Sequence, residues 1–113
     1  MPCLEEIRSY CASKPGAFED FPFGPDVLVF KTGKNKIFGL IRLGTRPVLI
    51  NLKCEPFLAL ELREKYDAVK PGYHMNKTHW NTVTVDGSIP DEEIIAMIDL
   101  SFDLVNGKTA KKR

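Results

Sequence analysis

Three β-rich segments joined by very short connections place the strongest constraint on the fold of this chain. The segments are DVLVFK (26–31), KIFGLIRL (36–43) and PVLINLK (47–53), and only TGKN and GTR separate them. Connections of this length join antiparallel strands, because a parallel crossover needs a dozen or more residues. Along 47–53, apolar positions alternate with Leu49, Asn51 and Lys53. The sequence therefore predicts an antiparallel meander with one buried and one partly wet face.

Apolar residues recur at helical spacing in three further segments, one before this region and two after it. The stripes are Leu4, Ile7 and Cys11; Leu58, Leu62 and Tyr66; and Ile94, Ile98, Phe102 and Val105. Ser88, three residues before Asp91, is expected to cap the third helix. Residues 69–72 are expected to form a connector and 81–85 a further strand, while 18–23 read as an edge strand or an extended lead-in.

The order of these elements predicts an α+β fold, in which helices pack on one face of an antiparallel sheet. A length of 113 residues suits one domain with one core. We assign that domain to residues 1–107, because no linker or internal repeat interrupts them. The basic segment KTAKKR (108–113) lacks apolar residues and is expected to be a disordered tail.

Composition narrows the range of functions. A net charge of +1 means that any contact with nucleic acid needs a local basic face. The three cysteines form no C-x-x-C pair, which argues against a disulfide framework and a zinc knuckle and favours reduced thiols that serve as small packing residues. No run approaches the roughly 20 apolar residues of a membrane span, and the first residues lack a secretory pattern. We therefore expect a cytoplasmic protein with no membrane contact.

One polar segment stands out between Pro71 and Glu93. Eight of its residues, 74–81, include two histidines, two asparagines, a lysine and the chain's single tryptophan. One interpretation is a recognition surface, in which Lys77 neutralises phosphate and Trp80 stacks on a ring. The other is structural, because His and Asn side chains satisfy loop backbone groups while Trp80 fills the core beneath. The sequence leaves both open.

The same segment carries a family resemblance. PGYHMNKTHWNTV followed by DGSIPDEE resembles the signature of the MmcQ/YjbR-like bacterial proteins. The likeness extends to CASKPGAFEDFPFG, LKCEPFLALELREKY and IDLSFDLV, and so covers nearly the whole chain. It implies a compact α+β fold similar to that of CyaY and frataxin, and the family is commonly labelled DNA-binding. The resemblance therefore adds double-stranded DNA to the expected partners.

Catalytic and metal chemistry find little support. His74 and His79 are five residues apart, which misses the i, i+4 spacing of two ligands on one helical face. The acidic ridge of frataxin-like iron handling is missing too, because the first helix offers only Glu5 and Glu6. No nucleophile elbow, P-loop or dinucleotide fingerprint is present. We assign no catalytic residue, no metal site and no cofactor.

Basic residues gather in hairpin tips and connectors, whereas acids gather in the helices. Such lysines either form a basic face or protect strand edges from aggregation, and the sequence fits both uses. We hypothesise a non-enzymatic protein that binds double-stranded DNA with low sequence specificity. Its phosphate contacts would come from Arg46, Lys53, Lys70 and Lys77, and orientation from His74, Asn76 and His79, with Trp80 and Asn81 as structural residues. The alternative is a protein- or small-ligand-binding module that uses the loop His74–Asn81.

Overall fold

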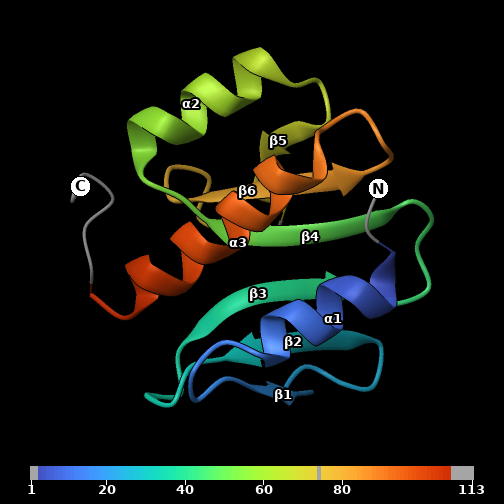
Figure 1. Cartoon of the computed structure of the whole chain (residues 1–113), viewed down its shortest axis with the longest axis vertical. Helices are drawn as coiled ribbons and strands as arrows, with labels where there is room; N and C mark the ends of the chain where they lie inside the picture. Colours follow the sequence, from blue (N-terminus) through green and yellow to red (C-terminus); the bar gives the residue numbers. More distant parts are fainter. Residues whose placement is uncertain (1–2, 74, 108–113) are drawn as a thin grey trace.

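Three helices and six strands make up the computed structural model, which describes residues 3–73 and 75–107 (Figure 1). In chain order they are α1 (Leu4–Ala12), β1 (Phe18–Asp20), β2 (Val27–Lys31), β3 (Ile37–Arg42), β4 (Val48–Lys53), α2 (Pro56–Lys65), β5 (Val69–Pro71), β6 (Trp80–Val85) and α3 (Asp91–Val105). His74 and the tail 108–113, for which disorder was expected, lie outside the described residues.

A single six-stranded sheet in the order β1-β2-β3-β4-β6-β5 forms one layer. Every neighbouring pair is antiparallel, and β1 to β4 follow one another as a meander. All three helices lie on the same side of this sheet (Figure 1) and contribute to one apolar core with it. The predicted α+β fold with helices packed on one face of an antiparallel sheet is confirmed.

β5 is an element that the sequence did not reveal. Residues 69–72 were expected to be a connector, but Val69–Pro71 pairs with β6 at the edge of the sheet. The strand has three residues, of which Lys70 and Pro71 are exposed, so it shows no apolar alternation. A proline is tolerated there because an edge strand has one side without ladder bonds. The prediction of a connector was wrong because this pairing depends on β6, ten residues further along the chain.

The two faces of the sheet differ in character. Leu28, Ile41, Ile50 and Val83 stand in register across β2, β3, β4 and β6 and are at most 1% exposed beneath the helices. The opposite face carries no helix (Figure 1). It bears the alternate residues of β4, Leu49 and Asn51, so the period-2 pattern predicted for this strand is confirmed.

Asn51 on this open face is nevertheless buried, where the sequence predicted a partly wet position. It is 8% exposed and lies opposite Thr82 of β6, which is 9% exposed. The Thr82 hydroxyl donates a hydrogen bond to Asn51 Oδ1 and accepts one from the backbone N–H of Tyr73. A buried polar pair of this kind is stable because its groups satisfy one another.

Phe38 of β3 packs against α3 where the pairing of β2 with β3 is irregular. The register between β2 and β3 shifts at Phe30/Lys31, and the Phe38 ring then meets the Phe102 ring of α3 edge-on at 5.1 Å. The buried Ser101 hydroxyl donates to Phe38 O at 2.5 Å and accepts from Lys53 N at 2.8 Å. Ser101 thus joins α3 to the ends of both β3 and β4.

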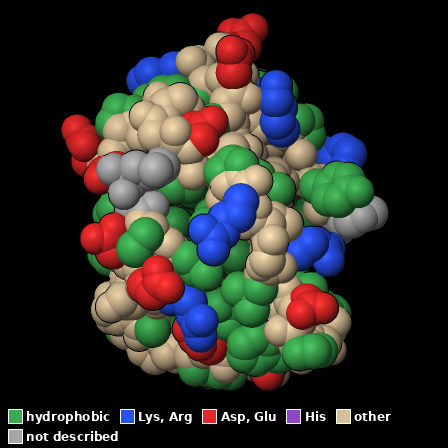
Figure 2. All heavy atoms as spheres, turned by 90° about the vertical axis from the view of Figure 1, so that its right-hand side faces the viewer, with side chains coloured by type: hydrophobic (Ala, Val, Ile, Leu, Met, Phe, Trp, Pro, Cys, Tyr) green, Lys and Arg blue, Asp and Glu red, His purple; other side chains and the backbone are tan. Residues whose placement is uncertain are grey.

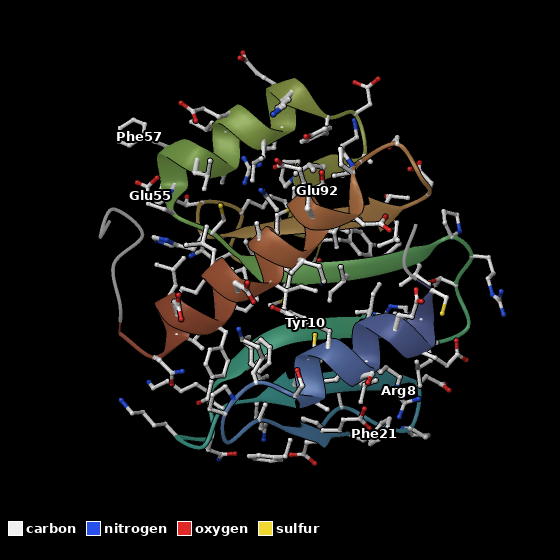
Figure 3. The ribbon with its side chains drawn as sticks, viewed as in Figure 1. Arg8, Tyr10, Phe21, Glu55, Phe57 and Glu92 are labelled. Atoms are coloured by element: carbon white, nitrogen blue, oxygen red, sulfur yellow. The ribbon has the colours of Figure 1, made fainter. Side chains whose placement is uncertain are left out.

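A side-chain cap explains where α2 begins, whereas α3 begins without one. Glu55 accepts a hydrogen bond from Leu58 N at 2.9 Å, and Pro56 occupies the first turn of α2, so the start predicted at Glu55-Pro56 is confirmed (Figure 3). α3 begins at Asp91 after Pro90, and the prediction that Ser88 caps it was wrong. Ser88 instead donates to Asp86 from its backbone and its hydroxyl, which completes a local turn.

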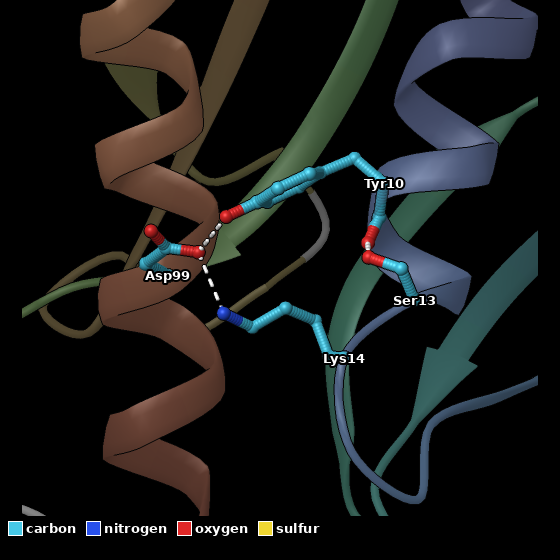
Figure 4. A network of polar contacts seen from close by, with 4 residues as sticks. All are labelled: Tyr10, Ser13, Lys14 and Asp99. Carbon is cyan, nitrogen blue, oxygen red and sulfur yellow. Dashed lines mark hydrogen bonds and ion pairs between the residues drawn. The ribbon is translucent and has the colours of Figure 1, made fainter.

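The buried stripe of α3 is confirmed, since Ile94, Ile98, Phe102 and Val105 all enter the core. α1 is joined to α3 by a polar network as well as by packing (Figure 4). Asp99 Oδ1 accepts from the Tyr10 hydroxyl at 2.5 Å and from Lys14 Nζ at 2.7 Å. The hydrogen bond to Asp99, together with burial, raises the pKa of Tyr10.

The cysteines follow the expected pattern only in part. Cys11 and Cys54 are buried free thiols, whereas Cys3 is an exposed one. Burial raises the pKa of Cys11 to about 12 and that of Cys54 to about 11, so both remain protonated at neutral pH. Among the helices described, none is both long enough and apolar enough to cross a membrane.

Candidate functional site

The polar loop between β5 and β6 is held from outside by Arg63 of α2. Its Nε donates to Asn81 Oδ1 at 2.7 Å, and its Nη2 donates to the carbonyl oxygens of Lys77 and, at 3.4 Å, Trp80. Asn81 is 2% exposed, so this charged donor satisfies a buried amide. Arg63 was not among the sequence-predicted site residues, because nothing local marks one arginine of an amphipathic helix as the partner of a distant loop.

The loop also orders itself from within. Asn76 Oδ1 accepts from Thr78 N at 2.9 Å and from His79 N at 3.3 Å, as asparagine does in many turns. Lys77 Nζ donates to Gly72 O at 3.0 Å, so the ammonium proposed as an outward phosphate contact is bonded to its own loop. A Cβ on Gly72 would lie 2.8 Å from Trp80 Cβ, which explains the glycine there. These contacts give Asn76 and Lys77 defined roles in the loop's conformation.

Of the two histidines, the structure describes only His79. His79 is exposed and its carbonyl accepts from Cys54 N at 2.8 Å, while His74 lies outside the described residues. Within the part of the chain that the structure describes, no group of three or more His, Cys, Asp or Glu side chains could hold a metal ion.

A basic depression forms at the end of the sheet where β4 leads into α2 and α3 ends (Figure 1). Its volume is about 690 Å³, and we use "basic depression" for this feature throughout. It is lined by Lys34, Asn35, Lys36, Ile37, Lys53, Trp80, Leu104, Val105, Asn106 and Gly107. Three lysines and one half-buried tryptophan therefore meet there from three separate strands or turns.

The lysines of the basic depression have no ion-pair partner among the described side chains. Lys34 and Lys36 are exposed and Lys53 is half-buried, and no side chain in residues 3–73 and 75–107 forms an ion pair with them. Lys31 differs, since it is bound to Asp20 at 2.8 Å on the open face. The end of α3 lines the same depression, so the negative end of the helix dipole lies beside these lysines, and no basic residue of its own last turn offsets it.

The sequence-predicted phosphate contacts do not form one surface. Lys53 lies in the basic depression, whereas Arg46 lies in the turn before β4, with roughly 20 Å of extended strand between them. Lys70 is exposed on the edge strand β5. Figure 2 looks onto the end that bears the β3–β4 turn, where basic, acidic and hydrophobic side chains are interspersed rather than gathered by charge. A continuous basic face that includes Arg46 is therefore absent on that side.

Fold and site together define the class: a small two-layer α+β domain with an open sheet face, a loop braced by arginine and a basic depression at one end. The chain belongs to the YjbR family, whose model matches residues 12–104. This confirms the resemblance drawn from the polar segment.

Three known proteins illustrate the relationship. The chain is 33% identical over 99 residues to YjbR of Escherichia coli K12, with 88% of this chain and 83% of YjbR covered. It is 40% identical over 92 residues to YbdF of Escherichia coli O157:H7, covering 81% and 75%. The crystal structure of Deinococcus radiodurans protein DR2400, a DUF419 domain, superimposes with a TM-score of 0.90 at 36% identity, covering 98% of this chain and 84% of that one. None of these descriptions states an activity.

Proposed function

We propose that the protein binds double-stranded DNA without catalysing a reaction, and that the basic depression is the contact surface. The observation that carries this proposal is the meeting of Lys34, Lys36 and Lys53 around Trp80, with no carboxylate partner among the described side chains. Lysines held close together without counter-charges suit the phosphate backbone, which supplies most of the affinity of sequence-tolerant binding. The cytoplasmic location expected from the sequence belongs to this proposal.

The position of the depression favours backbone contact over base reading. Its lysines come from a hairpin turn and a strand end, and no helix projects from it to enter a major groove. Low sequence specificity follows. The chain continues beyond Gly107 with KTAKKR, which adds basic residues to the sequence directly after one wall of the depression.

The expected salt dependence can be worked out from three phosphate contacts. Each contact contributes about −0.9 to the slope of log K against log salt concentration, which gives a slope of about −2.7. Raising salt from about 50 mM to about 200 mM should then weaken binding roughly 40-fold. A shallower slope would mean that fewer of the lysines engage phosphate.

Fluorescence anisotropy with a labelled 20-base-pair duplex of arbitrary sequence tests the proposal. The variant with Lys34, Lys36 and Lys53 all changed to alanine should bind at least tenfold more weakly than the native protein. A control variant with Arg46, Lys65 and Lys70 changed to alanine loses the same charge elsewhere and should retain most of the affinity. Since Trp80 is the single tryptophan, its fluorescence provides a second readout at the depression itself.

Two results would defeat the proposal. One is the absence of measurable binding at about 50 mM salt, where three phosphate contacts are least screened. The other is equal loss of affinity in both triple variants, since that would indicate a response to net charge alone. A single-stranded oligonucleotide of equal length completes the design. If the protein prefers it to the duplex, the proposal of duplex binding is replaced by one of single-strand binding, with bases stacked on Trp80.

The alternative drawn from the sequence, a ligand-binding use of the loop between β5 and β6, is supported by a different observation. Tyr73 and Met75 of this loop border a cavity on the open face of the sheet, away from the basic depression.

A further inference from the structure

The open face of the sheet is hollowed into a cavity of about 330 Å³. Its lining is formed by Phe23, Val27, Leu40, Arg42, Leu49, Asn51, Tyr73, Met75 and Thr82, and we call it the open-face cavity. The volume lies at the lower end of the range for small-molecule sites, which are mostly apolar with a few placed polar groups. Five of the nine residues are purely apolar side chains, so the cavity has that composition.

Two aromatic side chains border the cavity, one towards each edge of the sheet. Phe23 lies between β1 and β2, and Tyr73 lies between β5 and β6. They are 62% and 64% exposed, so both rings leave apolar surface open beside the cavity. Tyr73 is anchored, because its backbone N–H donates to the Thr82 hydroxyl in the lining at 2.9 Å.

The polar groups of the cavity offer hydrogen-bond donors. Thr82 Oγ1 accepts from Tyr73 N and donates its own proton to Asn51 Oδ1. Among the described residues, Asn51 Nδ2 has no hydrogen-bond acceptor. In the described chain, every fully buried side-chain nitrogen or oxygen has a hydrogen-bond partner. Asn51 Nδ2 is therefore not fully buried, and the solvent that it reaches lies in the cavity that Asn51 lines. An amide donor thus faces the largely apolar cavity.

Arg42 adds a positive charge to the same lining. It stands opposite Val27 in the β2–β3 ladder, and none of the described carboxylates pairs with it. An arginine without a partner beside apolar surface is a typical carboxylate-binding group, because its guanidinium matches the carboxylate geometry. Both polar donors therefore select an acceptor, and one of them selects negative charge.

We propose that the open-face cavity binds a small organic acid, in which a carboxylate meets Arg42 and Asn51 and a flat apolar body lies between Phe23 and Tyr73. This site is separate from the basic depression, so it stands whether or not DNA is bound. The apolar body gains from burial against Leu40, Leu49 and Met75. The carboxylate fixes its orientation and excludes amines of the same shape.

A matched set of probes tests the site by amide NMR shifts: 4-phenylbutyrate, its neutral amide 4-phenylbutyramide, and 4-phenylbutylamine. The carboxylate should give saturable shifts at Leu40, Leu49 and Thr82, and the amide should bind about tenfold more weakly. The amine should not bind. Arg42→Gln should lower the affinity for the carboxylate about tenfold.

Arg46→Gln is the matched control, since Arg46 is also exposed and unpaired within the described chain but lies outside the cavity lining. It should bind 4-phenylbutyrate like the native protein. The variant with Lys34, Lys36 and Lys53 changed to alanine should do so too, which separates this site from the DNA proposal. The inference is overturned if 4-phenylbutyrate gives no saturable shifts up to about 10 mM, if the amide binds as tightly as the acid, or if Arg42→Gln and Arg46→Gln behave alike.

Discussion

Replacing Arg63 with alanine should destabilise the whole domain, because this side chain joins α2 to the loop before β6. Its strongest bond, Nε to Asn81 Oδ1 at 2.7 Å, goes to a residue that is only 2% exposed. Leaving a buried amide oxygen without its charged donor costs about 1.5–3 kcal/mol. The bond to the Lys77 carbonyl is exposed and that to the Trp80 carbonyl is long, at 3.4 Å, so water can replace both, and we assign each about 0.5 kcal/mol.

These contributions sum to about 3 kcal/mol for Arg63→Ala. In a domain of 113 residues, 1 kcal/mol shifts the midpoint of thermal unfolding by about 4 °C, so a decrease of about 12 °C is expected. Arg63→Lys retains one charged donor but not the fork, and should recover about half of the loss. Urea unfolding followed by Trp80 fluorescence and by far-ultraviolet circular dichroism measures the free energy with two probes.

A double-mutant cycle with Asn81→Ala shows whether the effect arises from this contact. The two substitutions should couple by at least about 1 kcal/mol, because each removes the same hydrogen bond. Arg46→Ala, a change of an exposed and unpaired arginine, should alter stability by no more than about 0.5 kcal/mol. Simple additivity in the cycle, or an Arg63→Ala value within the range of the Arg46→Ala control, would refute this reasoning.

Two further predictions concern titrating groups near α1. Asp99→Asn should lower the free energy of unfolding by about 1 kcal/mol. Because the bond to Asp99 raises the pKa of Tyr10, an ultraviolet titration of this variant should show one tyrosine ionising at lower pH than in the native protein. A tyrosine titration curve that does not change would contradict the network in Figure 4. Burial raises the pKa of Cys11 to about 12, so the folded state retains a proton that the unfolded thiol loses above about pH 9. The stability that this provides is present below that pH and declines as the pH rises towards 12, by about 2 kcal/mol between about pH 9 and about pH 11. Cys11→Ala should flatten this part of the profile in urea unfolding, and parallel profiles for the two proteins would count against it.

The middle of the fold could be predicted well because its signals are local. Strands β2, β3 and β4 fall within the three β-rich segments, since short connections and period-2 alternation need no information from elsewhere in the chain. The stripe of α3 was predicted for the same reason. β5 was missed because an edge strand of three residues is defined by its partner. Ser88 was misplaced because α3 begins only after Pro90, which leaves Ser88 in the turn closed by Asp86.

The site was less accessible to sequence reasoning. The polar loop was identified as a special segment, and its family signature was recognised correctly. The bond from Lys77 to Gly72 could not be predicted, because it depends on how the loop folds back on itself. Arg63 left no signal at all, since an arginine on a helix surface looks alike whether it meets solvent or a buried amide.

The sequence by itself determined the antiparallel sheet, the helical stripes and the family, because these follow from spacing and composition within short windows of the chain. Only the tertiary structure decided which side chains meet. It brought Lys34, Lys36, Lys53 and Trp80 together in the basic depression, and separated Lys53 from Arg46 along the length of β4. It also left one face of the sheet without helices, where residues from six segments enclose the open-face cavity. The physical reason is that binding surfaces depend on contacts between residues distant in the chain, and strand order and helix placement fix those contacts.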